Sequence, residues 1–278
     1  MTNQPSRPIQ PTYRTGLGAS DADHIWLLGH ELADLLGTVT FGELAYWMVA
    51  KRRPTEGQRV LFEAVLVALA DHGFTPTAIA ARVTYLSAPD SVQGAVAAGL
   101  LGGGSRFLGV TENSANFLHT VIAGLDEMPT QDHEWDAIAT MVVADAKAAG
   151  GFVPGLGHPV HKRADPRTPV LFRLAHDHGV FGPHLALFEA IGRAHPPILG
   201  RTLPLNGAGV CGAVLADIDL PLGVTRGFAL LARCAGLLGQ LAEEMADPIG
   251  NDIYMNVDRN TDYQPPIADR GPDGERDG

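Results

Sequence analysis

Helical periodicity governs the sequence from about residue 41 to residue 246 and leaves little room for other secondary structure. Apolar residues recur there at a spacing near ~3.6, which is typical of helices with one buried face. The alternation expected of a strand is scarce, and "HIWLLG" at 24–29 is the one plausible short hairpin segment. The sequence therefore predicts an all-α fold, with helices over residues 41–52, 56–73, 76–88, 90–101, 112–125, 133–149, 169–178, 184–194 and 223–246.

The two ends of the chain have a different character from its middle. Residues 1–13 are polar and contain three prolines, so we expect a flexible arm. Residues 262–278 are charged and rich in Pro and Gly, so we expect a disordered tail. Between them, Asp90 and Ser91 are good candidates for a helix N-cap. The longest apolar segment, 223–246, is expected to be central.

Composition narrows the class of protein. The chain has 278 residues, 45% of them hydrophobic, and a formal net charge of −11. No basic stripe is present, so a nucleic-acid partner is not expected. No run reaches the ~18 apolar residues of a membrane span, and the N-terminus lacks an apolar secretory segment. The two cysteines, Cys211 and Cys234, lie in apolar helical patterns, which favours buried thiols in a reducing cytoplasm.

The segment "FVPGLGHPVHKRADPR" at 152–167 interrupts the helices. Its glycines and prolines are incompatible with a helix interior, so it must be a shaped loop. His158 and His161 stand three residues apart in this loop. That spacing lacks a convincing third ligand nearby, and we therefore predict no metal site. A histidine held by such a loop is a better candidate for acid–base chemistry or hydrogen-bond donation.

Cations follow His158 closely in the same loop. Lys162, Arg163 and Arg167 form a short basic patch. Such a patch is often a solvated surface. The alternative is that the turn at Asp165 directs Arg167 back toward His158, where a guanidinium could bind a carboxylate through two hydrogen bonds.

Three further residues each allow two interpretations, a structural role or ligand binding. Arg233 lies inside the most apolar helix, so it must pair with an acid or with a ligand. His72 closes the helix predicted over 56–73, where it either interacts with the helix dipole or donates into a cleft. Arg106 is a weaker candidate for ligand binding. Together, His72, His158, Arg167 and Arg233 predict a cleft that binds a small di- or tricarboxylate.

At this point the motifs resemble a known family. "ADHGFTPTAIAARVTYLSAPDSVQGAVAAGLLGGGSRFLGVTENSANFL" (70–118), followed by "GLGHPVHKRADPR" (155–167), resembles the citrate synthase superfamily. The short chain and "GGGSRFLG" are similar to its citryl-CoA lyase branch, including the lyase module of ATP-citrate lyase. The resemblance covers roughly residues 14–255. It implies an all-α homodimer with its active site in a cleft, and domains at 14–160 (large), 161–222 (small, on the CoA side) and 223–261 (return to the large domain).

The resemblance also implies roles for particular residues. The family makes or breaks the carbon–carbon bond between acetyl-CoA and oxaloacetate and uses no metal. His158 falls on the histidine that polarises or deprotonates the reacting oxygen, and His72 on a histidine that contacts the substrate. The implied substrate-binding residues are Arg167, Arg233, Arg106 and Asn206. The implied contacts with coenzyme A are Val153, Pro154, Gly155, Leu156, Gly157 and Lys162.

The chain departs from the family pattern at two reactive positions. Phe107 replaces the histidine of the synthases, as in the lyase branch, which favours cleavage over citrate synthesis. Ala208 replaces the family's acid–base aspartate, and residues 245–251 lack the expected arginine of the second subunit. Candidates for a substitute carboxylate are Asp252, Asp217 and Glu112.

The sequence therefore predicts cleavage of a citryl-CoA-type 3-hydroxyacyl-CoA to acetyl-CoA and oxaloacetate or a related ketoacid. The CoA thioester is the expected substrate, and a cytoplasmic homodimer is the expected form. Two alternatives remain open. One is a non-catalytic paralogue that binds CoA esters, and the other is a citrate or alkylcitrate synthase.

Overall fold

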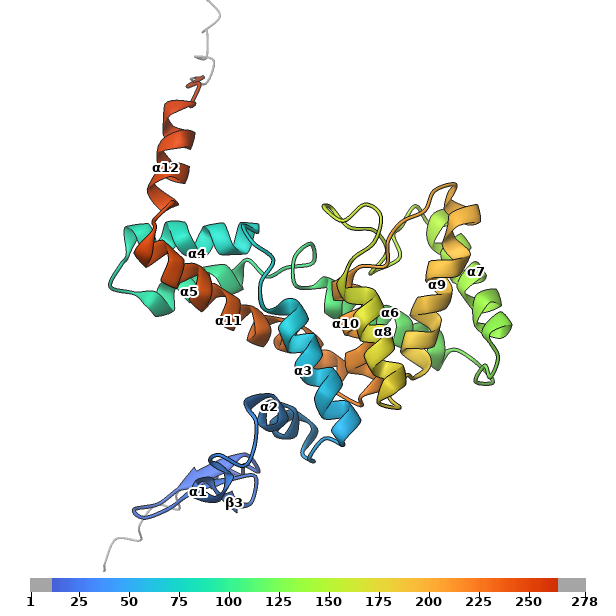
Figure 1. Cartoon of the computed structure of the whole chain (residues 1–278), viewed down its shortest axis with the longest axis horizontal. Coiled ribbons are helices and arrows are strands. Elements are labelled where there is room, and N and C mark those ends of the chain that lie inside the picture. The colour runs from blue at the N-terminus through green and yellow to red at the C-terminus, as the bar shows by residue number, and fades with distance from the viewer. Residues whose placement is uncertain (1–11, 265–278) are drawn as a thin grey trace, which may run out of the picture. The chain divides into compact units, whose positions relative to one another are not determined.

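A computed structural model describes residues 12–264 and consists almost entirely of helices (Figure 1). The strands are β1 (Gly18–Ser20), β2 (Ile25–Leu27) and β3 (His30–Glu31). The helices are α1 (Leu32–Leu35), α2 (Phe41–Ala50), α3 (Glu56–Ala70), α4 (Pro76–Ser87), α5 (Val92–Leu101), α6 (Val110–Ala123), α7 (Asp132–Ala148), α8 (Arg167–Asp177), α9 (Pro183–Leu199), α10 (Gly207–Asp217), the 3₁₀ turn η1 (Leu222–Val224), α11 (Thr225–Ala246) and α12 (Gly250–Arg259).

The nine predicted helical segments are all helices in the structure, from α2 to α9 and α11, so the predicted fold class is confirmed. Ser91 caps α5 by accepting the Gly94 N–H at 3.3 Å, whereas Asp90 precedes the cap. The segment 24–29 contributes β2 to a small antiparallel sheet of order β1-β2-β3. Most of the predicted arm and tail, residues 1–11 and 265–278, lies outside the described residues.

The C-terminal end of α3 differs from the prediction. The helix ends at Ala70, because Asp71 has an extended backbone and Gly73 follows with φ +69°. His72 therefore lies in the connection after the helix rather than in its last turn. The predicted position of His72 inside the end of the helix is thus wrong by two residues.

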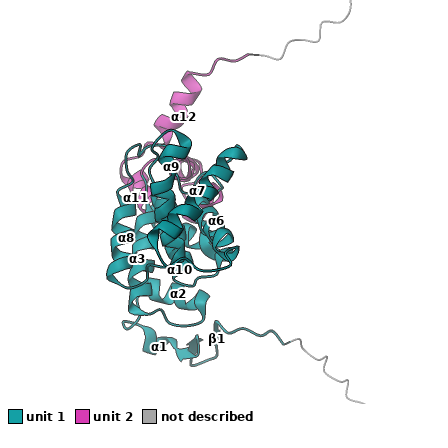
Figure 2. Cartoon of the chain, turned by 90° about the vertical axis from the view of Figure 1, so that its right-hand side faces the viewer, with its two compact units in different colours: residues 1–72, 103–236 teal, residues 73–102, 237–278 magenta. Residues whose placement is uncertain are grey.

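The described residues group into two compact units (Figure 2). Of the described residues, unit 1 combines 12–72 and 103–236, and unit 2 combines 73–102 and 237–264. These units do not follow the predicted boundaries. The reason is that α10, from the segment 161–222, packs against α3 and α6 as well as α8 and α9, so these helices share one core. The assignment of residues 161–222 as a small domain on the CoA side stays a prediction.

The core of unit 1 is built around α10, which contains the apolar helical pattern predicted around Cys211 but is not among the nine predicted helices. Its first nine residues are small or apolar, and most are fully buried. A Cβ on Gly212 would approach the Thr111 carbonyl oxygen of α6, so only glycine permits this helix contact. Tyr46 Oη donates to the Ile218 carbonyl oxygen at 2.8 Å just beyond α10. The rigid centre of unit 1 is therefore the α6–α10 pair.

The two cysteines are unpaired within the described residues. Cys211 on α10 is fully buried, and burial raises the pKa of its thiol to about 12. Cys234 on α11 is only partly buried. The expectation of two buried thiols therefore holds for Cys211 and only in part for Cys234.

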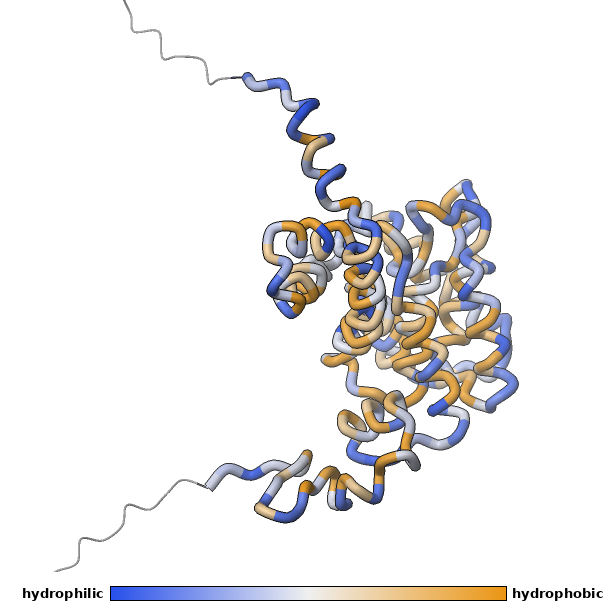
Figure 3. Tube along the Cα trace, turned by 60° about the vertical axis from the view of Figure 1, so that its left-hand side comes forward, coloured by the Kyte–Doolittle hydropathy of each residue, from blue (hydrophilic) through white to orange (hydrophobic). Residues whose placement is uncertain are grey.

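Unit 2 is held together by a buried arginine as well as by apolar contacts. Arg82 of α4 is 1% exposed and donates to Gln240 at 2.8 Å and to Glu244 at 3.0 Å. Glu244 in turn accepts the backbone N–H groups of Ile249 and Gly250, where α12 begins. Polar and apolar residues alternate along α12 in Figure 3, and most of its side chains are exposed.

One segment, Leu222–Ala246, is long and apolar enough to span a membrane by length and composition alone. This corrects the expectation that no segment reaches that threshold. A buried core helix passes the same test. In unit 1 the apolar face of this segment contributes Phe228, Ala229 and Ala232 to the core.

Candidate active site

The loop between α7 and α8 is irregular, as predicted, and two glycines give it its shape. Gly155 and Gly157 have φ values of +86° and +90°, which side-chain-bearing residues rarely adopt. A Cβ on Gly155 would lie 2.6 Å from the Phe188 ring and 2.9 Å from the Cα of Gly209. Gly155 is therefore needed for both its conformation and its close approach to α9 and α10.

Asn206 connects this loop to the start of α10. Its backbone N–H donates to the Gly155 carbonyl oxygen at 2.8 Å, and its Nδ2 donates to the Gly157 carbonyl oxygen at 2.7 Å. Its Oδ1 accepts the Gly209 N–H at 2.8 Å and so caps the helix. The predicted substrate-binding Asn206 thus has a clear positioning role: it fixes the loop that carries His158.

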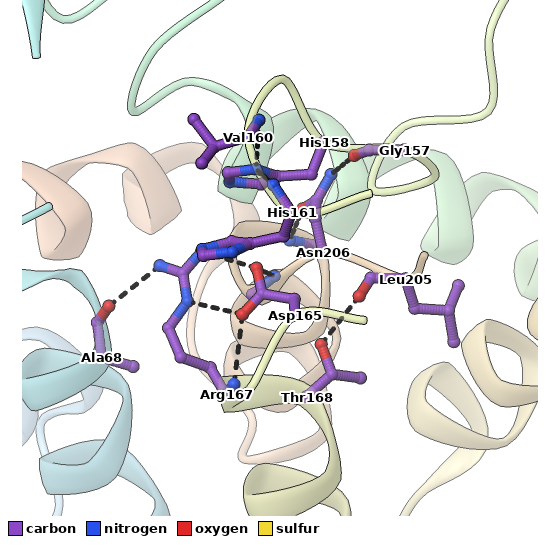
Figure 4. Close-up of polar contacts among 12 residues, drawn as sticks. Ala68, Gly157, His158, Val160, His161, Asp165, Arg167, Thr168, Leu205 and Asn206 are labelled. Carbon is purple, nitrogen blue, oxygen red and sulfur yellow. Dashed lines mark hydrogen bonds and ion pairs between the residues drawn. The ribbon is translucent and has the colours of Figure 1, made fainter. Parts of the chain in front are cut away.

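Three histidines meet at the tip of the loop. The ring of His158 lies 4.4 Å from that of His161 and 5.4 Å from that of His72, measured between centroids. All three are half-buried, and one ring nitrogen from each lies within 4.8 Å of the other two. Figure 4 shows His158 and His161 one above the other beside Asp165 and Arg167. The sequence separates His72 from the other two, and only the fold brings it to them.

His158 is a neutral hydrogen-bond donor in this arrangement. Burial, reinforced by the neighbouring His161, lowers the pKa of His158 to about 4. Its Nδ1 accepts the backbone N–H groups of Val160 at 3.0 Å and His161 at 2.9 Å. These bonds assign the proton of the neutral ring to Nε2. His158 therefore offers an N–H group to an oxygen atom at neutral pH.

Arg167 is fixed by a buried carboxylate. Asp165 accepts from Arg167 Nε at 2.9 Å and from Nη2 at 2.8 Å, and it also accepts the Gly207 N–H at 2.7 Å. Burial alone would raise the pKa of Asp165, but these bonds outweigh it and hold the pKa well below the usual range. Arg167 Nη1 donates to the Ala68 carbonyl oxygen at 3.1 Å. A guanidinium has five N–H donors, so Arg167 keeps capacity for a ligand.

Arg233 joins Arg167 at the end of α3. Its Nη2 lies 3.5 Å from the Leu69 carbonyl oxygen, and the side chain is nearly buried. Burial lowers the pKa of Arg233, while the nearby Asp71 raises it and Arg167 lowers it further. Both guanidinium groups thus lie at the C-terminal end of α3, where the last carbonyl groups have no partners within the helix. This end also carries the negative pole of the helix dipole, which favours cations. Asp71 therefore provides an acidic partner for Arg233, as expected for a buried arginine. This pairing is compatible with ligand binding by Arg233.

The remaining predicted binding residues differ in exposure. Val153 and Gly155 are buried, Pro154, Leu156 and Gly157 are partly buried, and Lys162 and Arg106 are exposed. Lys162 Nζ donates to the His158 carbonyl oxygen at 3.1 Å, which links the basic patch to the histidine turn. Arg106 lies between α5 and α6, and no contact connects it to the histidine cluster.

A cavity of about 440 Å³ opens beside the predicted CoA loop. Val153 and Leu156 of the loop line it, together with Phe152 and the cations Lys147 and Arg201. Lys147 Nζ donates to a backbone carbonyl oxygen at 2.6 Å, so its charge is held at the cavity wall. An apolar cavity with fixed cations suits a ligand that combines ring or alkyl groups with phosphates.

Two of the three candidate carboxylates are already occupied. Glu112 pairs with Arg226 at 2.5 Å. Asp217 is fully buried, contacts His184 at 2.7 Å and accepts backbone N–H groups at the start of α9. Asp252 is exposed on α12, in unit 2. Neither Glu112 nor Asp217 is therefore a ready replacement for the aspartate missing at Ala208.

The helical fold and the glycine-shaped histidine loop define the class of protein. The family described as "Citrate synthase, C-terminal domain" matches residues 28–254, and the chain belongs to the citrate synthase family. A search of curated proteins finds no match.

Solved structures agree with this assignment. Citryl-CoA lyase from Hydrogenobacter thermophilus is 27% identical with a TM-score of 0.80, and the alignment covers 92% of this chain and 96% of that one. ATP citrate lyase from Methanothrix soehngenii, in complex with citrate and coenzyme A, is 21% identical with a TM-score of 0.76. That alignment covers 93% of this chain but 43% of that one. Citrate synthase from Pyrobaculum aerophilum is 24% identical, with a TM-score of 0.58 and coverages of 86% and 55%. The last two similarities show the fold alone.

Sequence reasoning gave two neighbours of the site too little weight. The sequence places His161 in a two-histidine motif and Asp165 in a turn, without assigning either residue a role in the site. The signal for Asp165 was its position two residues before Arg167, which allows one carboxylate to hold both the backbone and the side chain of that arginine.

Proposed function

We propose that this protein cleaves a citryl-CoA-type 3-hydroxyacyl-CoA into acetyl-CoA and oxaloacetate or a related ketoacid. The observation that carries the proposal is the convergence of Arg167 and Arg233 at the end of α3, beside the histidine cluster. Each of the two guanidinium groups can bind one carboxylate of the substrate, and His158 presents an N–H group to the substrate's hydroxyl or carbonyl oxygen. The similarity to a citryl-CoA lyase over nearly its whole length supports the same reaction.

The chemistry follows from these groups. In the cleavage direction the tertiary hydroxyl loses its proton to a neutral imidazole, and the carbon–carbon bond breaks to give a ketone and the enolate of acetyl-CoA. The enolate carbon then takes up a proton, so the proton count is unchanged. Because Nε2 of His158 already carries a proton, His158 stabilises the oxygen, and the neighbouring His72 or His161 accepts the hydroxyl proton. The arginines keep the reacting carbons aligned.

The cavity beside Val153 and Leu156 supports a site for the distal part of coenzyme A in this proposal. The positive charges of Lys147 and Arg201 suit its phosphates, and Phe152 offers an exposed ring for stacking on the adenine base. Binding along this loop would place the thioester end toward His158. We also propose that the active form is a cytoplasmic homodimer.

One observation favours a second candidate function. Ala208, at the start of α10, cannot transfer a proton, and two of the candidate carboxylates, Glu112 and Asp217, are engaged elsewhere. A protein that binds CoA esters without turning them over is consistent with this loss.

The test is direct. Purified protein is incubated with citryl-CoA, and oxaloacetate release is followed above the uncatalysed background. We expect release by the wild-type chain, loss of release in His158→Ala, and unchanged release in His133→Ala, which removes an exposed histidine at the start of α7. Normal turnover in His158→Ala would refute the role of His158. Binding of CoA ester without any release would favour the non-catalytic alternative, and condensation of acetyl-CoA with oxaloacetate without cleavage would favour a synthase.

A further inference from the structure

A buried histidine lies behind the wall of the cavity, outside the histidine cluster. His195 of α9 is 1% exposed, and both of its ring nitrogens have hydrogen-bond partners. Its Nδ1 lies 3.0 Å from the Ile191 carbonyl oxygen, and its Nε2 accepts the Leu203 backbone N–H at 2.8 Å. Because a carbonyl oxygen only accepts, Nδ1 carries the proton of the neutral ring and Nε2 carries the lone pair. The ring therefore links the last turns of α9 to the segment that follows the helix.

The end of α9 needs such a link because two prolines interrupt its hydrogen bonds. Pro196 and Pro197 lie inside the helix and have no N–H to donate to the carbonyl groups one turn earlier. Gly200 follows the helix and turns the chain with a φ of +69°. Beyond it the chain is irregular, and the Leu203 N–H donates to a side chain rather than to a carbonyl group. His195 thus fixes a segment that has little regular structure of its own.

The segment after α9 borders the candidate active site on two sides. Arg201 and Leu203 line the cavity proposed for coenzyme A. The same segment continues alongside the glycine-shaped loop, where the Gly157 N–H donates to the Pro204 carbonyl oxygen at 2.7 Å. Gly157 directly precedes His158. A shift of the backbone at Leu203 would therefore displace the cavity wall and a contact of the histidine loop together.

We propose that His195 is a positioning residue for the coenzyme, which holds the cavity wall in the form that binds CoA. His195 does not line the cavity, so it acts through the Leu203 N–H and the neighbouring Arg201. The role requires a hydrogen-bond acceptor at the position of Nε2 and no charge. This inference rests on the coenzyme site of the proposed function, but not on the cleavage step.

Substitutions at His195 separate the hydrogen bond from the packing. Glutamine is long enough to place its Oε1 acceptor near the position of Nε2, so it keeps the bond to the Leu203 N–H. Phenylalanine keeps a buried ring without an acceptor, and it leaves that N–H without a partner in the interior. Asparagine is too short to reach the same N–H and serves as a second variant without the bond.

Tyr46→Phe is the matched control for stability. It removes one buried hydrogen bond elsewhere in unit 1, from Tyr46 Oη to the Ile218 carbonyl oxygen. A residue that acts only on stability should resemble this control, whereas a positioning residue should also change the affinity for the coenzyme.

The experiment measures binding of coenzyme A itself by isothermal titration calorimetry, with far-UV circular dichroism to check that each variant is folded. We expect His195→Phe and His195→Asn to weaken CoA binding by about 10-fold, the factor of one buried hydrogen bond, and His195→Gln to stay within about 3-fold of the wild type. Tyr46→Phe should lower the melting temperature and leave CoA affinity unchanged. Hydrogen exchange of a peptide that covers Leu203 should be faster in His195→Phe than in the wild type or His195→Gln.

Wild-type CoA affinity in either folded variant without the acceptor would overturn the inference. Equal weakening in His195→Gln and His195→Phe would also overturn it, because packing rather than the hydrogen bond would then be responsible. The same holds for an equal loss of affinity in Tyr46→Phe, since any loss of stability would then suffice. Absence of CoA binding to the wild type would remove the inference together with the coenzyme site. The expected binding pattern without any oxaloacetate release would leave the inference standing and refute the proposed cleavage.

Discussion

Replacing Asp165 by asparagine tests whether the buried Asp165–Arg167 pair holds the active-site loop in place. The Asp165 carboxylate is fully buried and Arg167 is only 20% exposed. Removing one partner of a buried ion pair typically costs about 3–5 kcal/mol, because the other charge is left uncompensated. Asparagine keeps one acceptor oxygen, so we expect a loss near the lower limit, ~3 kcal/mol. In a chain of this size that corresponds to a fall in melting temperature of roughly 6–12 °C.

The matched control is Asp136→Asn. Asp136 also accepts two N–H groups of an arginine, Arg193, but both side chains are about 40% exposed. Exposed pairs contribute little, so this variant should lose less than about 1 kcal/mol. Urea titration of both variants and the wild type gives the free energies of unfolding. Equal losses in the two variants would refute the reasoning, since burial would then make no difference.

The pH dependence provides a second check on the same pair. The pKa of Asp165 is lowered in the folded chain, so its contribution is fully present above the pKa of an unfolded aspartate, about 3.9. It is lost as the pH falls through the lower, folded pKa. We therefore expect the difference between wild type and Asp165→Asn to stay constant from pH 8 to pH 5 and to shrink only below about pH 4. A difference that disappears between pH 7 and pH 5 would contradict this assignment.

Two further pairs of variants test the loop and the cavity. Gly155→Ala should cost about 3 kcal/mol by thermal unfolding, because it adds strain at positive φ and a clash with Phe188, whereas Gly157→Ala adds strain alone, about 1 kcal/mol. Equal costs would show that the close approach at Gly155 is not needed. Arg201→Gln should raise KM for citryl-CoA several-fold with little change in kcat, and Arg173→Gln, which removes an exposed arginine of α8, should change neither. An unaltered KM in Arg201→Gln would place the coenzyme elsewhere.

Local signals explain what could be predicted of the fold. Helices such as α3 and α7 carry their own periodicity and end signals, so sequence alone located them to within a few residues. Helix α10 lacks that signal. Its face toward α6 is glycine and alanine, and burial on all sides removes the polar stripe that marks an amphipathic helix. The grouping of α10 with helices from distant parts of the chain is likewise not encoded in any local pattern.

The sequence predicts which residues gather at the site, but not the contacts between them. His158, Arg167 and Arg233 were recognisable because their residue types conflict with their surroundings. The meeting of His72 with the loop histidines depends on the packing of α3 against α8, which no local pattern encodes. The protonated nitrogen of His158 was likewise beyond the sequence, since it follows from two backbone N–H groups that only the folded turn directs at the ring.

The early end of α3 has a consequence for how this protein can vary. If the helix continued past Ala70, the carbonyl groups of Ala68 and Leu69 would bond to backbone N–H groups four residues onward. They would then be poorer acceptors for Arg167 and Arg233, and His72 would turn with the new helical segment away from its present position. Extension of α3 and the present placement of the two guanidinium groups therefore compete for the same two oxygen atoms. In the proposed function, a mutation that favours helix at Asp71 or Gly73 would inactivate the protein without altering any of the residues proposed to bind the substrate.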